Sequence, residues 1–139
     1  NDTGLFTGIL YGNDIRPVLE DKRSVNLGSV YETSVAQELK AHRFSLYYYD
    51  NKKNGEVDYL IDDTKNMSSI PIEVKSGKDY MIHSALDKFI ANKDYAVRQA
   101  YVLSNEANIF EKNGVTYIPI YFVMFFEHDV RLAPEEYIF

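Results

Sequence analysis

The sequence predicts an α/β domain in which a mixed central β-sheet is flanked by helices. Three observations support this fold class. A segment with helical apolar spacing precedes two strand-like segments joined by a short polar loop, and a third strand-like segment follows a polar turn. A second helical segment then separates the third strand from a fourth, an order that favours a crossover connection and some parallel pairing. With 139 residues, the chain is long enough for one domain.

The N-terminal part is expected to differ from the rest. Between residues 3 and 19, glycine and proline interrupt the apolar positions, which indicates short helices joined by turns. We therefore expect a helical accessory segment over residues 1–25 and a core over residues 26–126, within a single domain spanning residues 1–139. Because the chain begins with Asn1 and not with Met, we also expect it to be a fragment of a longer protein.

The core is expected to begin with a helix. Asn26 belongs to the residue types that cap helix N-termini with their side-chain oxygen. The apolar positions after it recur at three- and four-residue steps and end near residues 41–43. These positions are Leu27, Val30, Tyr31, Val35 and Leu39.

Three strands are expected next. Residues 44–49 are aromatic and extended in character, residues 50–55 form a turn-rich polar loop, and residues 56–61 resume a strand pattern. A polar segment then leads to a strand over residues 70–75, with Pro71 near its start, where a missing N–H donor matters least. We expect neighbouring strands in this series to pair antiparallel.

The second half of the core continues the pattern. A helix is expected over residues 84–91 and a strand over residues 100–104. After the turn formers Asn113 and Gly114, residues 115–118 are expected to form a strand. Residues 120–126 are expected to form a closing apolar helix or strand.

Composition limits the partners and the compartment. The net charge of −6 works against a free-standing nucleic-acid binder, because phosphates attract clustered Lys and Arg, although a locally basic rim stays open. The absence of cysteine removes disulfides and thiolate metal sites and favours a reducing compartment, so we expect a cytoplasmic protein. The longest apolar run, residues 117–126, is about half of the roughly 20 residues that cross a bilayer, so no membrane span is predicted.

Acidic residues in the predicted strands suggest a site. Glu73 and Lys75 are two positions apart, so their side chains share one face of the strand, while Ile72 and Val74 point to the other face, toward the core. Asp58 lies on the preceding strand, where hairpin pairing can bring its carboxylate beside that of Glu73. We expect the apolar neighbours of Asp58 to lie on the face opposite it, namely Val57, Tyr59 and Ile61.

Carboxylates that meet in this way favour a hard cation. Asp58 and Glu73 would repel each other unless a proton or a cation lay between them, and oxygen ligands suit Mg²⁺ or Mn²⁺. Glu32 joins them if its helix packs on the sheet, and Lys75 could stabilise the charge that builds on a phosphate. The alternative for Asp58 and Glu73 is a solvated pair balanced by Lys75 and Lys78. For Glu32 the alternative is an exposed helix residue.

Two other groups of residues receive less weight. The histidines His42, His83 and His128 are dispersed, without the spacing of metal ligands, so we expect surface or partner contacts for them. The tyrosines at residues 47–49 and the lysines at residues 52–53 could stack on and screen a nucleic-acid strand. Sheet packing with a solvated loop is the preferred interpretation of these two segments.

The acidic residues also carry a resemblance to a known family. Glu32, the segment GEVD at residues 55–58 and the segment IEVKSG at residues 72–77 resemble the E...D...ExK signature of the PD-(D/E)XK nucleases. The surrounding blocks resemble the C-terminal domain of unknown function that is attached to a family of prokaryotic AAA-type ATPases, over residues 2–126. These blocks are residues 28–39, 48–49, 56–61 and 71–75.

The resemblance implies a restriction-endonuclease-like core and assigns roles to residues. Asp58 and Glu73 would bind the metal, Mg²⁺ or Mn²⁺, and Glu32 would complete the site from its helix, while Lys75 would be the catalytic lysine. The partner would be an AAA-type ATPase module upstream in the same protein, with nucleic acid as the substrate. The chain has no GxxxxGK[ST] loop, so no nucleotide site is expected in it.

Two functions stay open at this point. The first is metal-dependent hydrolysis of phosphodiester bonds by a nuclease domain that the ATPase supplies with substrate. The second is a non-catalytic docking or regulatory domain that keeps the nuclease fold. The intact set of Glu32, Asp58, Glu73 and Lys75 favours the first, and the acidic net charge favours the second.

Overall fold

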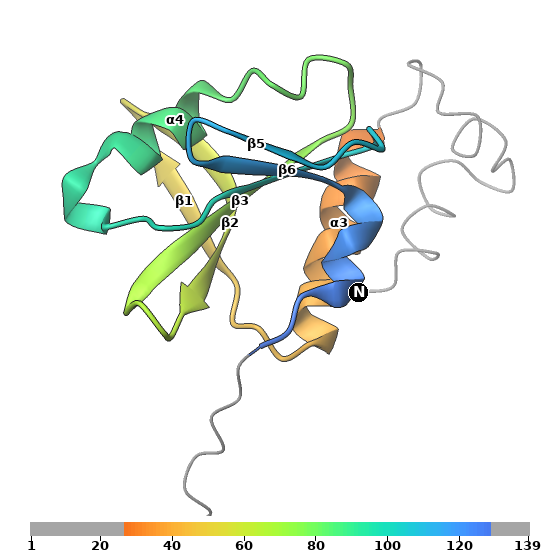
Figure 1. The fold of residues 1–139 in the computed structure, drawn as a ribbon, viewed down its shortest axis with the longest axis horizontal. Coiled ribbons are helices and arrows are strands. Elements are labelled where there is room, and N and C mark those ends of the chain that lie inside the picture. The colour runs from red at the N-terminus through yellow and green to blue at the C-terminus, as the bar shows by residue number, and fades with distance from the viewer. Residues whose placement is uncertain (1–26, 129–139) are drawn as a thin grey trace, which may run out of the picture.

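The computed structural model describes residues 27–128, and Figure 1 shows their arrangement. The accessory segment predicted for residues 1–25 and the capping residue Asn26 lie outside the described residues. The elements in chain order are α3 (Leu27–Ala41), β1 (Tyr47–Asn51), β2 (Gly55–Asp63), β3 (Ser68–Lys75), α4 (Ser84–Ala91), the 3₁₀ helix η1 (Lys93–Tyr95), β4 (Tyr101–Ser104), β5 (Phe110–Lys112), β6 (Val115–Pro119) and the 3₁₀ helix η2 (Ile120–Phe125). No helix between residues 27 and 128 has the length and apolarity that a membrane span requires.

The strands of the described part form one mixed sheet with the order β1-β2-β3-β4-β6-β5. The pairs β1–β2, β2–β3 and β5–β6 are antiparallel. The pairs β3–β4 and β4–β6 are parallel. This arrangement confirms the predicted α/β class with a mixed central sheet, including the parallel pairing that the helix between β3 and β4 indicated.

Helices cover both faces of the sheet (Figure 1). We call the two faces the α3 face and the α4 face. On the α3 face, residues of α3 and η2 pack against β2, β3, β4 and β6, with a core that includes Val35, Leu39, Ile72, Leu103 and Val123. On the α4 face, Leu86 and Phe89 of α4 pack on Val57, Val102 and Tyr117. A side chain on either face is therefore buried near the middle of the sheet.

The predicted elements differ from the observed ones mainly at their ends. β1 begins at Tyr47, not at residue 44, and continues to Asn51, whose side-chain oxygen accepts hydrogen bonds from the backbone N–H groups of Lys53 and Asn54 at 2.9 and 3.0 Å. These bonds shorten the predicted loop to three residues, 52–54. The closing segment is the 3₁₀ helix η2, one of the two forms expected for it.

The strand β5 was not predicted from the sequence. It pairs antiparallel with β6 through a two-residue turn in which Asn113 and Gly114 have φ angles of 53° and 77°. Positive φ at both central residues is typical of a type I′ hairpin turn, whose twist matches that of the flanking strands. The turn itself was expected at these residues, and β5 is the strand that it joins to β6.

β2 contains a β-bulge where it pairs with β1. Tyr47 pairs with Leu60 and Tyr49 pairs with Val57, so two steps along β1 correspond to three steps along β2. As a result, Val57 belongs to the core of the α4 face, whereas Tyr59 belongs to the core of the α3 face. The expectation that Val57 shares a face with Tyr59 and Ile61 was wrong, because strict alternation fails at a bulge.

Gly55, at the start of β2, lies close to Ala85 of α4, and replacement of Gly55 tests this close approach. Its φ is +92°, and a Cβ atom added there would lie 3.0 Å from the Cβ of Ala85. Gly55→Ala is therefore expected to destabilise the fold by about 1–3 kcal/mol in urea unfolding, through backbone strain and crowding. Gly77→Ala is the control, because nothing lies within 4 Å of a Cβ at that position. Equal unfolding free energies for the two variants would contradict the close approach.

Candidate functional site

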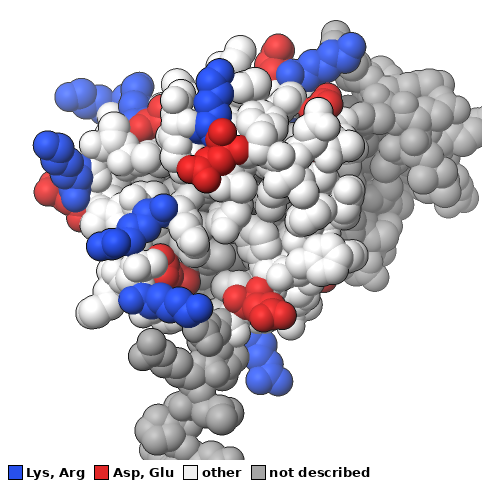
Figure 2. Space-filling model, in the orientation of Figure 1, with Lys and Arg blue, Asp and Glu red and all other residues white. Residues whose placement is uncertain are grey.

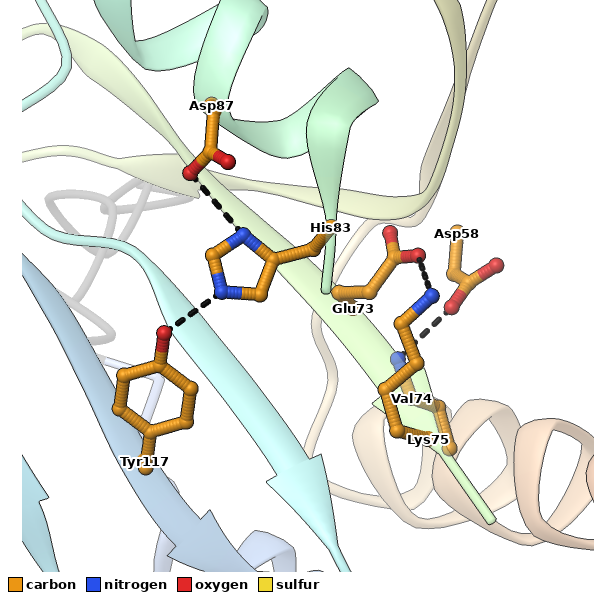
Figure 3. Close-up of polar contacts among 7 residues, drawn as sticks. All are labelled: Asp58, Glu73, Val74, Lys75, His83, Asp87 and Tyr117. Atoms are coloured by element: carbon orange, nitrogen blue, oxygen red, sulfur yellow. Dashed lines mark hydrogen bonds and ion pairs between the residues drawn. The ribbon is translucent and has the colours of Figure 1, made fainter. Parts of the chain in front are cut away.

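The site begins where β2 and β3 stop pairing as a regular ladder. The regular pairing of these strands runs from Asp63 with Ser68 to Tyr59 with Ile72. One residue before Tyr59 on β2, the Oδ2 atom of Asp58 accepts a hydrogen bond of 2.7 Å from the backbone N–H of Val74 (Figure 3). The carboxylate thus bonds a backbone donor of β3 at the position where the strand ladder ends.

Glu73 and Lys75 lie on β3 beside this point and form an ion pair. The Nζ atom of Lys75 is 2.8 Å from Oε1 of Glu73, which confirms that the two side chains share a face. Glu73 is only 7% exposed, and its Oε2 atom is buried without a hydrogen-bond partner. The alternative of a solvated acid is therefore wrong for Glu73, because both faces of the sheet are covered.

Glu32 reaches the same region from α3. The hydroxyl of Tyr59 donates a hydrogen bond of 3.0 Å to the backbone carbonyl of Glu32, which ties this turn of α3 to β2. Partial burial raises the pKa of the Glu32 carboxyl, the charge of Glu73 raises it further, and Lys75 opposes both. The structure therefore brings Glu32 into the electrostatic field of the other predicted site residues, and its side chain is half-buried.

The Asp58 carboxyl has a strongly raised pKa. Burial, followed by the charge of Glu73, raises the pKa of its carboxyl from 3.8 to about 7, although the Val74 N–H group opposes the shift. Desolvation disfavours the charged form of a carboxyl, and a neighbouring carboxylate adds repulsion. At neutral pH, Asp58 is therefore divided between its protonated and ionised forms, and any cation placed beside it would favour ionisation.

The carboxylate oxygens of this cluster are of the type that binds Mg²⁺ or Mn²⁺, but some of them already have partners within the chain. Carboxylate oxygens are the ligands that these ions prefer, and the Oε2 atom of Glu73 is a buried acceptor without a partner. Among residues 27–128, however, no group of three or more His, Cys, Asp and Glu side chains is arranged to hold a metal ion. Lys75 contacts Oε1 of Glu73, and the backbone N–H of Val74 donates to Oδ2 of Asp58, so an ion would have to displace these contacts or bind the other oxygen of each carboxylate.

His83 takes part in a buried network that the sequence did not indicate. It is 7% exposed, with Nε2 2.6 Å from the hydroxyl of Tyr117 and Nδ1 3.0 Å from Oδ1 of Asp87 (Figure 3). The expectation of a surface or partner contact was therefore wrong for His83. The four-residue step from His83 to Asp87 was visible in the sequence, whereas the contact with Tyr117 depends on how β6 packs.

The other two histidines make local contacts. His42 lies 3.2 Å from Glu38, one helical turn earlier, and its Nδ1 atom contacts the backbone carbonyl of Phe126. The ring of His128 meets that of Phe44 edge to face, with centroids 5.1 Å apart. These contacts involve none of the four acidic-site residues, so we assign His42 and His128 no role in the site.

One tyrosine of β1 packs against α4, and the other two are exposed to solvent. Tyr49 packs edge to face on Phe89 with ring centroids 4.8 Å apart, as expected for a sheet residue. Tyr47 and Tyr48 are 50% and 68% exposed. On the face of the molecule in Figure 2, basic and acidic side chains alternate, so that view gives no continuous basic surface.

Comparison with protein-family models gives a match that covers most of the chain. The family model described as Domain of unknown function (DUF4143) matches residues 27–123, a range that contains all four predicted site residues. No curated protein matches the chain.

Proposed function

This chain belongs to the DUF4143 family, and we propose that it is the nuclease-like C-terminal domain of an AAA-type ATPase that hydrolyses phosphodiester bonds in nucleic acid. Domains of this family are typically found with AAA ATPases. The observation that carries the proposal is the buried acidic cluster, in which Glu73 is 7% exposed beside a carboxyl of Asp58 whose pKa is raised to about 7.

The cluster is costly for the fold, which supports a functional reason for it. Burial of a carboxylate is unfavourable unless the group is paired and hydrogen-bonded, and the Oε2 atom of Glu73 lacks a partner. Asp58 adds a second carboxyl that burial and Glu73 both disfavour in its ionised form. Groups with shifted pKa values that lie together are typical of functional sites.

Each residue has a separate task in the proposed activity. Asp58, Glu73 and Glu32 would hold Mg²⁺ or Mn²⁺ through carboxylate oxygens. When bound, such an ion polarises a phosphate and lowers the pKa of a coordinated water. Lys75 holds a positive charge beside Glu73, where it would stabilise the negative charge that develops on a phosphate.

Substrate delivery would fall to another part of the protein. The net charge of −6 repels a polyanion, so the isolated domain should bind nucleic acid weakly. We propose that the ATPase module brings the substrate to the acidic cluster. Metal binding by this chain is therefore a more direct first test than cleavage, because it does not depend on delivery.

We expect saturable Mn²⁺ binding in a calorimetric titration, with an affinity at least about tenfold weaker in Asp58→Asn because one anionic ligand is lost. The control is Asp62→Asn, which removes an exposed carboxylate from the same strand and should leave the affinity unchanged. Absence of saturable binding in the wild-type chain, or equal affinity in Asp58→Asn, would count against the proposed site.

One observation favours the second candidate, a non-catalytic docking or regulatory domain of the ATPase. The Lys75–Glu73 ion pair and the Val74–Asp58 hydrogen bond give the cluster partners within the chain, so a purely structural role is consistent with them. Cleavage by the full-length ATPase separates the candidates. A nuclease should lose cleavage in Lys75→Ala and in Lys75→Arg, which keeps a cation beside Glu73, whereas a docking domain should show no change in either variant.

A further inference from the structure

We propose that His83 is a positioning residue for the acidic site, acting through its hydrogen bond to Tyr117. The bond would hold the first turn of α4 and the preceding loop, residues 76–82, against the strands that carry Asp58 and Glu73. This inference rests on the proposed function, because its readout is the affinity of the acidic site for a divalent cation.

One hydrogen bond anchors the ring of His83. Its Nε2 atom lies 2.6 Å from the Tyr117 hydroxyl, which donates to it when that nitrogen is unprotonated, whereas Nδ1 lies 3.0 Å from Oδ1 of Asp87 without forming a hydrogen bond. Tyr117 is 4% exposed, and its ring stacks on Phe110 with centroids 4.6 Å apart. The Tyr117 ring that carries this hydroxyl is therefore held in place by its burial on β6 and by its stacking on Phe110.

The His83 side chain does not cap the helix that it begins. It is the N-cap residue of α4, but its side chain makes no capping hydrogen bond. Ser, Thr, Asp and Asn are the residues that normally stabilise this position, by about 1 kcal/mol relative to an uncapped end. The start of α4 is therefore held by a tertiary hydrogen bond to β6 and not by a local cap.

The strand register places this hydrogen bond in line with the acidic site. Glu73 pairs with Val102, and Val102 pairs with Tyr117, so the three residues form one row across β3, β4 and β6. Register partners point to the same face of a sheet, and both Val102 and Tyr117 belong to the core of the α4 face. The Glu73 side chain is consequently buried on the face that α4 covers.

A second contact fixes the same turn of α4 near Asp58. A Cβ atom at Gly55 would lie 3.0 Å from that of Ala85, two residues after His83. Gly55 is three residues before Asp58 on β2. The first turn of α4 therefore approaches β2 close to the segment that leads to Asp58.

The loop of residues 76–82 connects the end of β3, directly after Lys75, to the start of α4. Ile82, immediately before His83, is 70% exposed, whereas Tyr80 of the same loop packs on Tyr117 with ring centroids 6.0 Å apart, so Tyr117 contacts both the loop and His83. Loss of the Tyr117 hydroxyl would free the start of α4 and let the Glu73 side chain sample other rotamers. Groups that orient metal ligands typically change affinity by about 10–100-fold when they are removed.

The test is a calorimetric Mn²⁺ titration of the wild-type chain, Tyr117→Phe, His83→Gln and a control, Tyr101→Phe. Tyr117→Phe deletes a single hydroxyl and should weaken Mn²⁺ binding about tenfold. A glutamine amide can still accept from the Tyr117 hydroxyl, so His83→Gln should stay within about threefold of the wild type. Tyr101 lies on the α3 face, and loss of its hydroxyl should leave the affinity unchanged.

A readout independent of the metal separates positioning from general destabilisation. The backbone N–H of Asp87 donates to the His83 carbonyl at 3.0 Å, so hydrogen exchange at Asp87 reports on the first turn of α4. We expect faster exchange there in Tyr117→Phe and unchanged exchange in Tyr101→Phe. If the wild type binds Mn²⁺ and Tyr117→Phe binds equally well, the positioning role is wrong while the site stands. If the wild type binds no Mn²⁺, both proposals fail.

Discussion

Replacement of Asp58 by Asn is expected to raise the free energy of unfolding at pH 8 by about 2–4 kcal/mol in the absence of metal. The pKa of this carboxyl rises from 3.8 to about 7 on folding, so at pH 8 the folded chain must ionise a group that its surroundings disfavour. The amide of Asn carries no charge, and its oxygen can still accept the hydrogen bond from Val74. The substitution therefore removes the penalty and keeps the contact.

The sign of the pH dependence follows from the same shift. Between pH 4 and 7, the folded state keeps the Asp58 proton while the unfolded state has lost it, so this group makes stability fall as pH rises. Asp58→Asn would remove that part of the slope. Urea unfolding from pH 4.5 to pH 8 measures it, with Asp62→Asn as the exposed control on the same strand. A variant less stable than the wild type at pH 8 would refute the assigned environment of Asp58.

A second large effect is expected from the Glu73–Lys75 pair. Lys75→Met leaves the Glu73 carboxylate, at 7% exposure, without its cation, and should destabilise the fold by about 3 kcal/mol. Addition of Glu73→Gln to this variant removes the uncompensated charge, so the double variant should recover most of the loss. The measurement is urea unfolding at pH 7 of the two single variants and the double variant.

The control for this cycle is Lys78→Met, which removes an exposed lysine three residues after Lys75. Surface substitutions of this kind usually change stability by less than about 0.5 kcal/mol. Strict additivity of the two single changes would show that Glu73 and Lys75 do not interact in solution. A coupling of about 2 kcal/mol or more would support the buried pair.

Local patterns were sufficient for most of the fold. The spacing of Val35 and Leu39 predicts α3, and the polar break between β2 and β3 predicts their hairpin. The three-residue strand β5 could not be predicted because its side chains are half-buried or exposed, so it has no apolar alternation. The bulge in β2 could not be predicted because an extra residue is visible only against a partner strand.

The candidate site was predictable where its contacts are local along the chain. Glu73 and Lys75 meet because they are two positions apart on one strand, a relation that any β-strand imposes. The hydrogen bond from Tyr117 to His83 joins residues 34 positions apart. It requires the parallel placement of β6 beside β4, which no short sequence pattern specifies.

The bulge in β2 links the packing of this strand to the Asp58 carboxyl group. Val57 faces α4, Tyr59 faces α3 and Leu60 again packs on the α4 face, so these residues alternate regularly once Asp58 is left out. Asp58 is thus the extra residue of the bulge in β2, and its carboxylate accepts the hydrogen bond of the Val74 N–H where the strand pairing ends. Its deletion would leave a strand of ordinary alternation and remove the carboxyl group. Without that carboxyl group the Val74 N–H would need another acceptor, so the bulge couples the strand pairing to the chemistry of the site.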